Sequence, residues 1–161
     1  MEIKLTLALP REELSVPAVR RVLAASMKAL GVTEQTIADI EVALSEACTN
    51  VLDHAGGGSE YEVSAGIDGS MCVIEVIDRG PGFDSDGKGM ADAATQAEGG
   101  RGIQLMRELV DRVTFTNRPT EGTVVHLEKQ LEWNEGAVMA QLSETATTVR
   151  GPWSKDSAPL V

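Results

Sequence analysis

Glu46 and Asn50 lie four residues apart in the stretch EVALSEACTN, which has the apolar periodicity of a helix. At about 100° per residue, the two side chains lie roughly 40° apart and more than about 120° from Leu44, the middle of the apolar stripe. An amide oxygen is a hard ligand suited to Mg²⁺, and a carboxylate can accept a proton from an attacking hydroxyl. The pair therefore suggests a magnesium ligand beside a general base. Such pairs also occur on the solvated faces of amphipathic helices.

A second candidate is Asp78 in the stretch VIDRGPGFD, where it ends an apolar run typical of a buried strand. A strand would carry this carboxylate to the edge of the sheet, and Gly80 and Gly82 would let a ligand approach the backbone closely. A carboxylate in that place can accept a hydrogen bond from an exocyclic amine such as that of adenine. A tight turn is the alternative, because Asp, Gly and Pro are common turn residues.

Glycines form the third candidate stretch, GGRGIQLM, in which Gly99, Gly100 and Gly102 precede a helical pattern that begins near Ile103. Free N–H groups at the start of that helix would favour phosphate, and Arg101 adds positive charge. Taken alone, such a stretch is also typical of a flexible joint. The three stretches together contain the parts of an ATP site, without the glycine patterns of P-loop or Rossmann proteins.

The elements that would position these residues follow from periodicity. Alternating apolar residues predict a strand over EIKLTLAL that ends at Pro10, and helical spacing predicts one helix that stops at Gly31 and a second capped by Thr33. Two hairpins are predicted, YEVSAGIDGSMCVIEVID with a central second strand and VTFTNRPTEGTVVHLEKQL after a third helix. This order predicts an α+β fold, a two-layer sandwich with the helices on one face of a mixed, mostly antiparallel sheet.

Two segments lack the pattern of a core element. The glycine-rich stretch from Arg79 to Gly102 has few large apolar residues, which predicts a long functional loop able to act as a lid. Beyond residue 131 the periodicity fades and the chain becomes rich in Ser, Thr, Pro and Gly. We therefore expect one domain over residues 1–131 and a flexible tail over residues 132–161.

Composition excludes several classes of function. The 161-residue chain carries a net charge of −11, which argues against nonspecific binding to nucleic acid. No apolar run approaches the roughly 20 residues of a membrane span, and the N-terminal stretch does not resemble a leader, so we expect a cytoplasmic protein without membrane contact. Cys48 and Cys72 have neither metal-site spacing nor nearby histidines, so we expect both to be small buried apolar residues.

The three stretches resemble the boxes of the GHKL ATPases, and more narrowly the bacterial anti-sigma factor serine kinases. Glu46 and Asn50 resemble the N box, Asp78, Gly80 and Gly82 the G1 box, and Gly100 and Gly102 the G2 box. The narrower resemblance covers about residues 1–130 and is based on the sequences LSEACTN, VIDRGPGFD and GRGIQLMRELVDRV.

The resemblance implies a role for each residue of these boxes. Glu46 would be the general base and Asn50 would coordinate Mg²⁺, while Asp78 would bind the adenine amino group, with support from Thr123. The other nucleotide-binding residues that it implies are Gly80, Gly82, Gly100, Arg101, Gly102 and Ile103. The resemblance further implies ATP and Mg²⁺ as cofactors, a sigma factor and an anti-anti-sigma protein of the STAS fold as partners, and assembly as a homodimer.

Three other functions are compatible with these residues. The segment DSDGKGMADAATQAE is acidic, with Lys88 as its single basic residue, and would repel a triphosphate unless Mg²⁺ offsets the charge. That composition favours a nucleotide-dependent binding protein that transfers no phosphate. The chain could also be the catalytic domain of a split histidine kinase, or a degenerate fold that binds no nucleotide.

Overall fold

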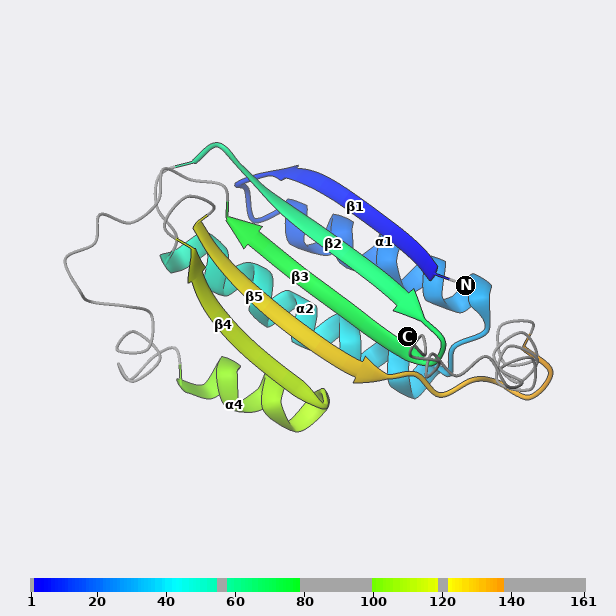
Figure 1. The fold of residues 1–161 in the computed structure, drawn as a ribbon. Coiled ribbons are helices and arrows are strands. Elements are labelled where there is room, and N and C mark those ends of the chain that lie inside the picture. The colour runs from blue at the N-terminus through cyan, green and yellow to red at the C-terminus, as the bar shows by residue number, and fades with distance from the viewer. Residues whose placement is uncertain (1, 55–57, 79–99, 119–121, 138–161) are drawn as a thin grey trace, which may run out of the picture.

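A computed structural model of the chain describes residues 2–54, 58–78, 100–118 and 122–137 (Figure 1). Its strands are β1 (Glu2–Pro10), β2 (Glu60–Asp68), β3 (Met71–Asp78), β4 (Arg112–Arg118) and β5 (Gly122–Gln130). Its helices are α1 (Ser15–Leu30), α2 (Glu34–His54) and α4 (Gly100–Leu109). These elements confirm the predicted α+β order.

The five strands form one sheet in the order β1-β2-β3-β5-β4. Every described strand pair is antiparallel, where a mixed, mostly antiparallel sheet was predicted. The two strands of each hairpin pair with each other, β2 with β3 and β4 with β5. The hairpins then join through an antiparallel pair between β3 and β5. The prediction that the second strand of the first hairpin is central is confirmed.

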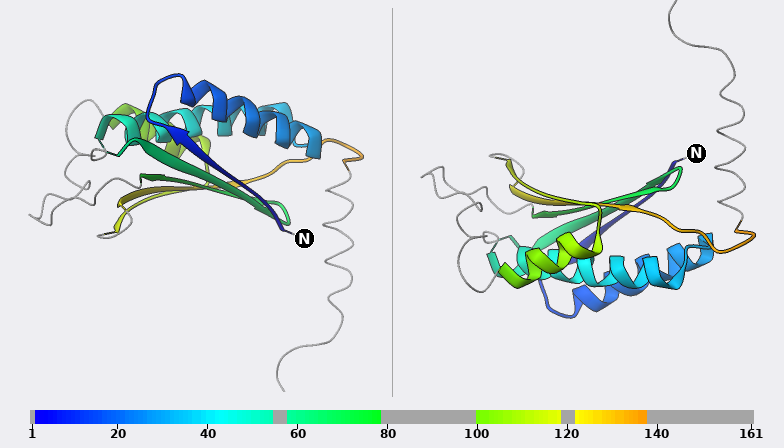
Figure 2. Two further views of the ribbon diagram at one scale, coloured as in Figure 1. Left: turned by 90° about the horizontal axis from the view of Figure 1, so that it is seen from above. Right: turned by 90° about the horizontal axis from the view of Figure 1, so that it is seen from below.

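The three helices of the described residues cover the same face of this sheet, which makes the fold a two-layer sandwich (Figure 2). The core lies between the layers, where alternate residues of β3 point toward the helices and are buried, namely Cys72, Ile74, Val76 and Asp78. The apolar stripe of α2 meets them, with Ile40, Leu44 and Ala47 at 1% exposure or less. Asp78 therefore ends a strand inside the helix-facing layer, where the periodicity alone would place an apolar residue.

Local signals fix the helix ends. Gly31 adopts a φ of 90°, and its N–H bonds to carbonyls of the last turn of α1, which ends that helix. The hydroxyl oxygen of Thr33 accepts a hydrogen bond from the N–H of Thr36 at 3.4 Å, which caps α2 as predicted.

The packed chain continues past the predicted domain boundary at residue 131. Trp133 forms a bridge with Val32, the N–H of Asn134 bonds to the carbonyl of Gly31 at 2.8 Å, and Ala137 is 9% exposed. Residues 132–137 therefore lie against the turn between α1 and α2 and belong to the fold. The rest of the predicted tail, residues 138–161, lies outside the described residues.

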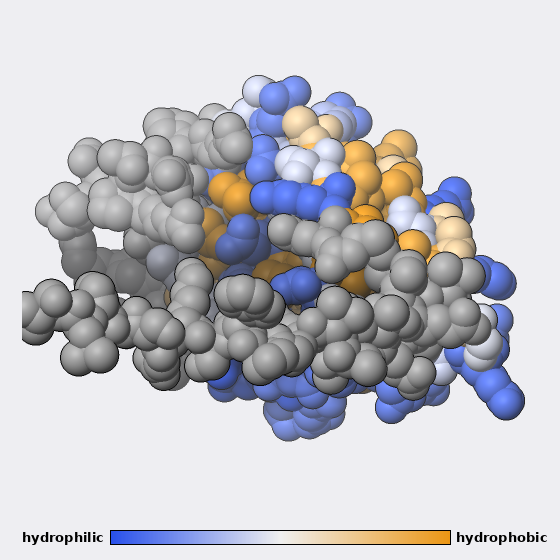
Figure 3. Space-filling view, turned by 45° about the vertical axis from the view of Figure 1, so that its right-hand side comes forward, coloured by the Kyte–Doolittle hydropathy of each residue, from blue (hydrophilic) through white to orange (hydrophobic). Residues whose placement is uncertain are grey.

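The surface combines charged residues with apolar ones. Figure 3 shows a band of apolar residues flanked by hydrophilic ones on one face of the molecule. Leu14, Val22 and Val42 are 79%, 43% and 41% exposed, respectively. No helix in the described ranges is long and apolar enough to span a membrane.

Candidate functional site

Helix α4 packs against α2, which carries Glu46 and Asn50. Both residues were predicted to face away from the buried stripe around Leu44, but Asn50 is buried and Glu46 is not fully exposed. Glu46 is half-buried, and Asn50 is only 9% exposed. The ordinary solvated helix face therefore does not describe this pair.

Asn50 has an unsatisfied amide. Its Nδ2 is buried and has no hydrogen-bond partner among the described residues. Leaving a buried donor unpaired costs about 1–3 kcal/mol, so such a group is typical of a position that a ligand or an ordered water completes. A phosphate oxygen or a water of a hydrated metal ion would accept this hydrogen bond.

Glu46 meets the first turn of α4 at Gly102. A Cβ built on Gly102 would overlap Oε2 of Glu46, so the carboxylate reaches this place because residue 102 has no side chain. The N–H groups of a first helical turn have no acceptor within the helix, and the positive end of the helix dipole favours a carboxylate there. The structure thus joins Glu46 of the predicted N box to Gly102 of the predicted G2 box.

Helix α4 begins at Gly100, earlier than the glycine pattern predicted, and this places Gly102 inside the first turn. Gly100 and Arg101 are exposed at the helix start. The side chain of Ile103 belongs to the hydrophobic core at 9% exposure, so only its backbone N–H faces the same way as the other first-turn groups.

Asp78 is 2% exposed and forms an ion pair that the sequence did not reveal. Nη1 of Arg11 donates to Oδ1 of Asp78 at 2.8 Å, and Nη2 of Arg11 donates to the carbonyls of Val51 and Leu52 at 3.0 and 3.1 Å. Arg11 directly follows the strand-ending Pro10 and precedes two glutamates. In sequence it is indistinguishable from a surface charge, because its partners lie 40 to 67 residues away.

Thr123 lies beside Asp78. The ladder between β3 and β5 ends with the pair Ile77 and Val124, so the next positions along the two strands are Asp78 and Thr123. Thr123 is 6% exposed. The predicted adenine acceptor and its supporting threonine are therefore adjacent at one end of the sheet, whereas Gly80 and Gly82 lie outside the described residues.

A buried polar cluster supports this end of the sheet. Tyr61 pairs with Asp78 across β2 and β3, and its hydroxyl is hydrogen-bonded to Oγ of Ser15 at 2.7 Å. Burial raises the pKa of Tyr61 and that of the neighbouring Cys48 to about 12. Both groups are therefore neutral near pH 7 and tie α1 and α2 to β2 without adding charge.

The arrangement fits a magnesium ion that is shared with a ligand. The described residues contain no cluster of three or more His, Cys, Asp or Glu side chains that could hold a metal by themselves. Mg²⁺ is often held by one or two protein oxygens together with phosphate oxygens and waters. The amide oxygen of Asn50 could supply one such ligand, while its unpaired Nδ2, a donor, would bond to a phosphate oxygen or to a metal-bound water.

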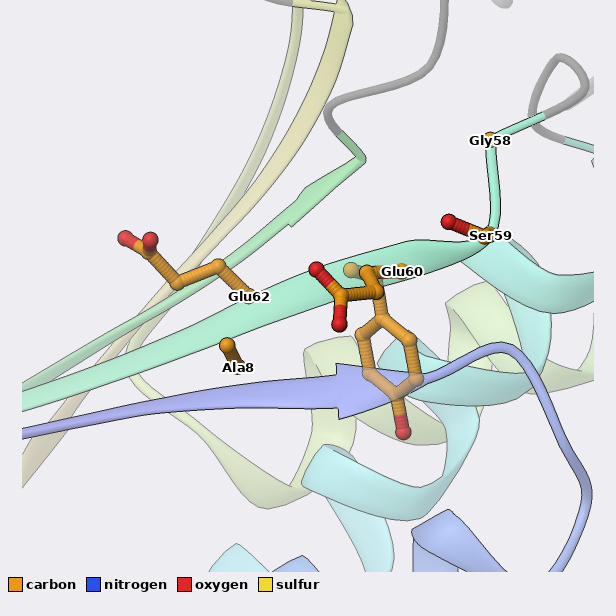
Figure 4. A pocket seen from close by; sticks show the side chains of 6 residues that line it. Ala8, Gly58, Ser59, Glu60 and Glu62 are labelled. Carbon is orange, nitrogen blue, oxygen red and sulfur yellow. The ribbon is translucent and has the colours of Figure 1, made fainter.

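A hollow of about 320 Å³ lies elsewhere, at the start of β2 (Figure 4). Its lining residues are Ala8, Gly58, Ser59, Glu60, Tyr61 and Glu62. The carboxylates of Glu60 and Glu62 give this hollow a negative charge, which would repel a triphosphate. None of the residues predicted to bind nucleotide lines it, so we do not assign the nucleotide to this hollow.

Comparison with known proteins gives the class of the protein. Residues 9–129 match the family described as the histidine kinase-like ATPase domain. The chain also resembles a solved structure of the RsbU and RsbW domains of Rv1364c from Mycobacterium tuberculosis, with a TM-score of 0.62 at 22% identity. That likeness covers 80% of this chain and 32% of the longer one, and it supports the fold. The protein is a GHKL-type ATPase domain.

Relatives narrow the class. An anti-sigma F factor of Thermoanaerobacter sp. (strain X514) is 34% identical over 121 residues, which cover 70% of this chain and 82% of the relative. The serine-protein kinase RsbW of Bacillus subtilis (strain 168) is 31% identical over 137 residues, which cover 74% of this chain and 84% of the relative. The chain belongs to the bacterial anti-sigma factor serine kinase family within the histidine kinase-like ATPases.

Proposed function

We propose that the protein is an ATP-dependent anti-sigma factor that binds a sigma factor and phosphorylates a serine on an anti-anti-sigma protein of the STAS fold. One observation carries this proposal: the half-buried carboxylate of Glu46 lies against the first turn of α4, one helical turn from the unsatisfied amide of Asn50. A protein that only bound nucleotide would not need a carboxylate in that place. The names of the relatives support the same reading.

The proposal assigns separate tasks to the two ends of the site. Asp78 accepts a hydrogen bond from the adenine amine with Thr123 beside it, and Asn50 offers its amide oxygen to Mg²⁺. The bound Mg²⁺ would offset the negative charge of the phosphates. The remaining nucleotide-binding residues of the proposal are Gly80, Gly82, Gly100, Arg101, Gly102 and Ile103, the last through its backbone N–H.

Phosphate transfer would use Glu46 as the general base. The carboxylate accepts the proton of the partner's serine hydroxyl as the serine oxygen bonds to the γ-phosphorus. The bond from that phosphorus to the bridging oxygen breaks, and ADP leaves with the electron pair. First-turn N–H groups of α4 would stabilise charge on the transferred phosphoryl oxygens.

The proposed partners rest on the family alone. Homodimer assembly and a cytoplasmic location are part of the same proposal, as is the absence of direct contact with nucleic acid, for which the net charge of −11 is a supporting observation.

Nucleotide binding is tested first, by thermal unfolding with and without ATP and Mg²⁺. A ligand at 100 times its Kd stabilises the native state by about 2.7 kcal/mol, which corresponds to a rise in Tm of about 5–10 °C for a domain of this size. We expect the magnesium-dependent part of the rise to be lost in Asn50→Ala. An unchanged Tm in the wild-type protein would show that the fold binds no nucleotide.

Kinase activity is tested by incubating the protein with γ-labelled ATP and candidate STAS proteins. We expect label on a serine of one of them. If ATP raises the Tm but no STAS protein becomes labelled, the kinase proposal fails while ATP binding stands.

A binding switch without phosphate transfer is the second candidate, and the acidic composition of residues 84–98 favours it. In that case sigma factor capture would depend on whether ATP or ADP is bound, and Glu46→Ala would leave regulation unchanged. Loss of regulation in Glu46→Ala with sigma factor binding intact supports the kinase instead.

A further inference from the structure

Arg11 joins three elements of the fold at the point where β1 ends. Its backbone N–H donates to the carbonyl of Ser59 before β2, and its guanidinium contacts both the end of α2 and the end of β3. The side chain is 12% exposed, so these contacts are made largely out of water. Such an arrangement differs from that of a surface arginine, which keeps its charge solvated.

One branch of the guanidinium donates hydrogen bonds to backbone carbonyls at the end of α2. Nη2 donates to the carbonyls of Val51 and Leu52, which belong to the last turn of a helix that ends at His54. The last four carbonyls of a helix have no donor within it, and the negative end of the dipole favours a cation there. Val51 directly follows Asn50, so this contact lies next to the proposed metal ligand.

The other branch holds the proposed adenine acceptor. Nη1 donates to Oδ1 of Asp78 at 2.8 Å, and the carboxylate has an exposed fraction of only 3%. A buried carboxylate with a charged partner is strongly oriented, because both the Coulomb attraction and the hydrogen bond are stronger in a low dielectric. The contact with Arg11 therefore restrains the direction in which the Asp78 carboxylate points.

The planar guanidinium connects these two contacts rigidly. We propose that Arg11 is a positioning residue that sets the Asp78 carboxylate relative to the last turns of α2, and thereby determines the selectivity of the site for adenine. This inference rests on the proposed function, because it needs a nucleotide whose exocyclic amine faces Asp78. Lysine cannot replace the arginine fully, since a single ammonium lacks the two branches in one plane.

The test compares the Kd of ATP with that of inosine triphosphate, measured by calorimetry in the presence of Mg²⁺. Inosine carries an oxo group where adenine carries the amine, so it offers an acceptor to a carboxylate that needs a donor. A hydrogen bond to a charged group corresponds to about tenfold to a hundredfold in affinity, and we expect the wild-type protein to prefer ATP by that factor.

Arg11→Met keeps much of the apolar length of the side chain but removes both branches. In Arg11→Met we expect the Kd values of ATP and inosine triphosphate to differ by no more than about threefold. Arg11→Lys should give a preference for ATP between that of Arg11→Met and that of the wild-type protein. Arg20→Met is the matched control, because Arg20 pairs with Glu41 at 3.7 Å on the half-exposed surface of α1. The ratio of the Kd of inosine triphosphate to that of ATP isolates the role of Arg11, because a general loss of stability would weaken the binding of both nucleotides alike.

Three results would overturn the inference. The first is a preference in Arg11→Met that stays within twofold of the wild-type value, and the second is tighter ATP binding in that variant, which would show that Arg11 competes with adenine. If Arg11→Met does not fold, an unchanged preference in Arg11→Lys is the third. Failure of the nucleotide binding on which the inference rests looks different, because the wild-type protein would then bind neither nucleotide, and failure of phosphate transfer alone would leave the preference for ATP unchanged.

Discussion

Glu46 and Asn50 lie one turn apart on α2, yet their surroundings differ, as the separate roles proposed for them require. Asn50 is buried with an unpaired amide, whereas Glu46 is half-buried against the start of α4. The first environment suits a group that completes its bonds with a bound ligand. The second suits a carboxylate held ready to accept a proton. Binding and transfer should therefore respond to different substitutions.

Glu46→Gln tests this separation directly. The amide keeps the shape of the side chain but cannot act as a base. General bases increase a reaction rate by a factor of about 10²–10⁴. We expect phosphate transfer to the STAS partner to fall by that factor, while the Kd of ATP stays within about twofold. Single-turnover labelling and calorimetry measure the two quantities. An undiminished rate would remove Glu46 from the mechanism.

Gly102→Ala tests the contact between α2 and α4. The new Cβ would overlap Oε2 of Glu46, the far end of a flexible side chain, so the carboxylate should move at little cost in stability. Alanine also favours the helix by about 0.5–1 kcal/mol over glycine. We expect a Tm equal to or above the wild-type value, with transfer reduced at least about tenfold.

The matched variant for stability is Gly100→Ala, whose Cβ would meet no atom within 4 Å. Its Tm should rise by a similar amount. A large drop in the Tm of Gly102→Ala alone would show that the Glu46 carboxylate cannot yield, and would contradict the expected separation of stability from rate.

At the scale of elements, the turn between α1 and α2 is held from outside by residues 132–137. Asn134 bonds to Gly31 and Val32 through its backbone and its side chain, and Trp133 pairs with Val32. The start of α2 is thus supported by a segment that follows the last strand. Because α2 carries both Glu46 and Asn50, this support also bears on the site.

Gly31→Ala should be among the costly glycine substitutions in the described chain. Its φ of 90° strains any side chain by about 1–3 kcal/mol, and its Cβ would lie 2.6 Å from the Cβ of Ala137. We expect a loss of about 2–4 kcal/mol in the free energy of unfolding, measured in urea.

Gly69→Ala is the control for backbone strain alone. Gly69 also has a positive φ, 61°, but a Cβ at this position would meet no atom within 4 Å, so we expect a loss of about 1 kcal/mol. Equal losses at the two positions would show that Ala137 does not pack against the turn in solution.

At the scale of the whole molecule, three buried groups make the fold sensitive to alkali. Burial raises the pKa of Cys48 and Cys72 from 9.0 to about 12 and that of Tyr61 from 10.0 to about 12. At a pH between the ordinary pKa of each group and about 12, the unfolded chain has lost protons that the folded chain keeps. The free energy of unfolding therefore falls as the pH rises through this range.

From pH 8 to pH 10 we expect a loss of about 3 kcal/mol in the free energy of unfolding from these three groups, close to 1.4 kcal/mol for each thiol. Denaturant unfolding at each pH measures it. Cys72→Ala should lower stability at every pH but flatten the dependence by about 1.4 kcal/mol. If the free energy of unfolding of Cys72→Ala fell with pH as steeply as that of the wild-type protein, the burial of this thiol would be contradicted.

Much of the architecture was predictable because local patterns and packing agree. The alternation in β1 and the first hairpin, the stripe of α2 and the stop at Gly31 each follow from short-range rules, and the structure confirms them. The start of α4 was less predictable. Glycine disfavours helix, but contact with Glu46 favours glycine at position 102.

The sequence by itself determined the element order, the two-layer class and the candidate residues, because periodicity and turn chemistry act over a few neighbours. Only the tertiary structure decided that β5 lies between β3 and β4, and that residues 132–137 join the fold. It also decided that Arg11 holds Asp78 and that Gly102 admits Glu46. These contacts join residues far apart in the chain, so their formation depends on how the layers pack and not on any local pattern.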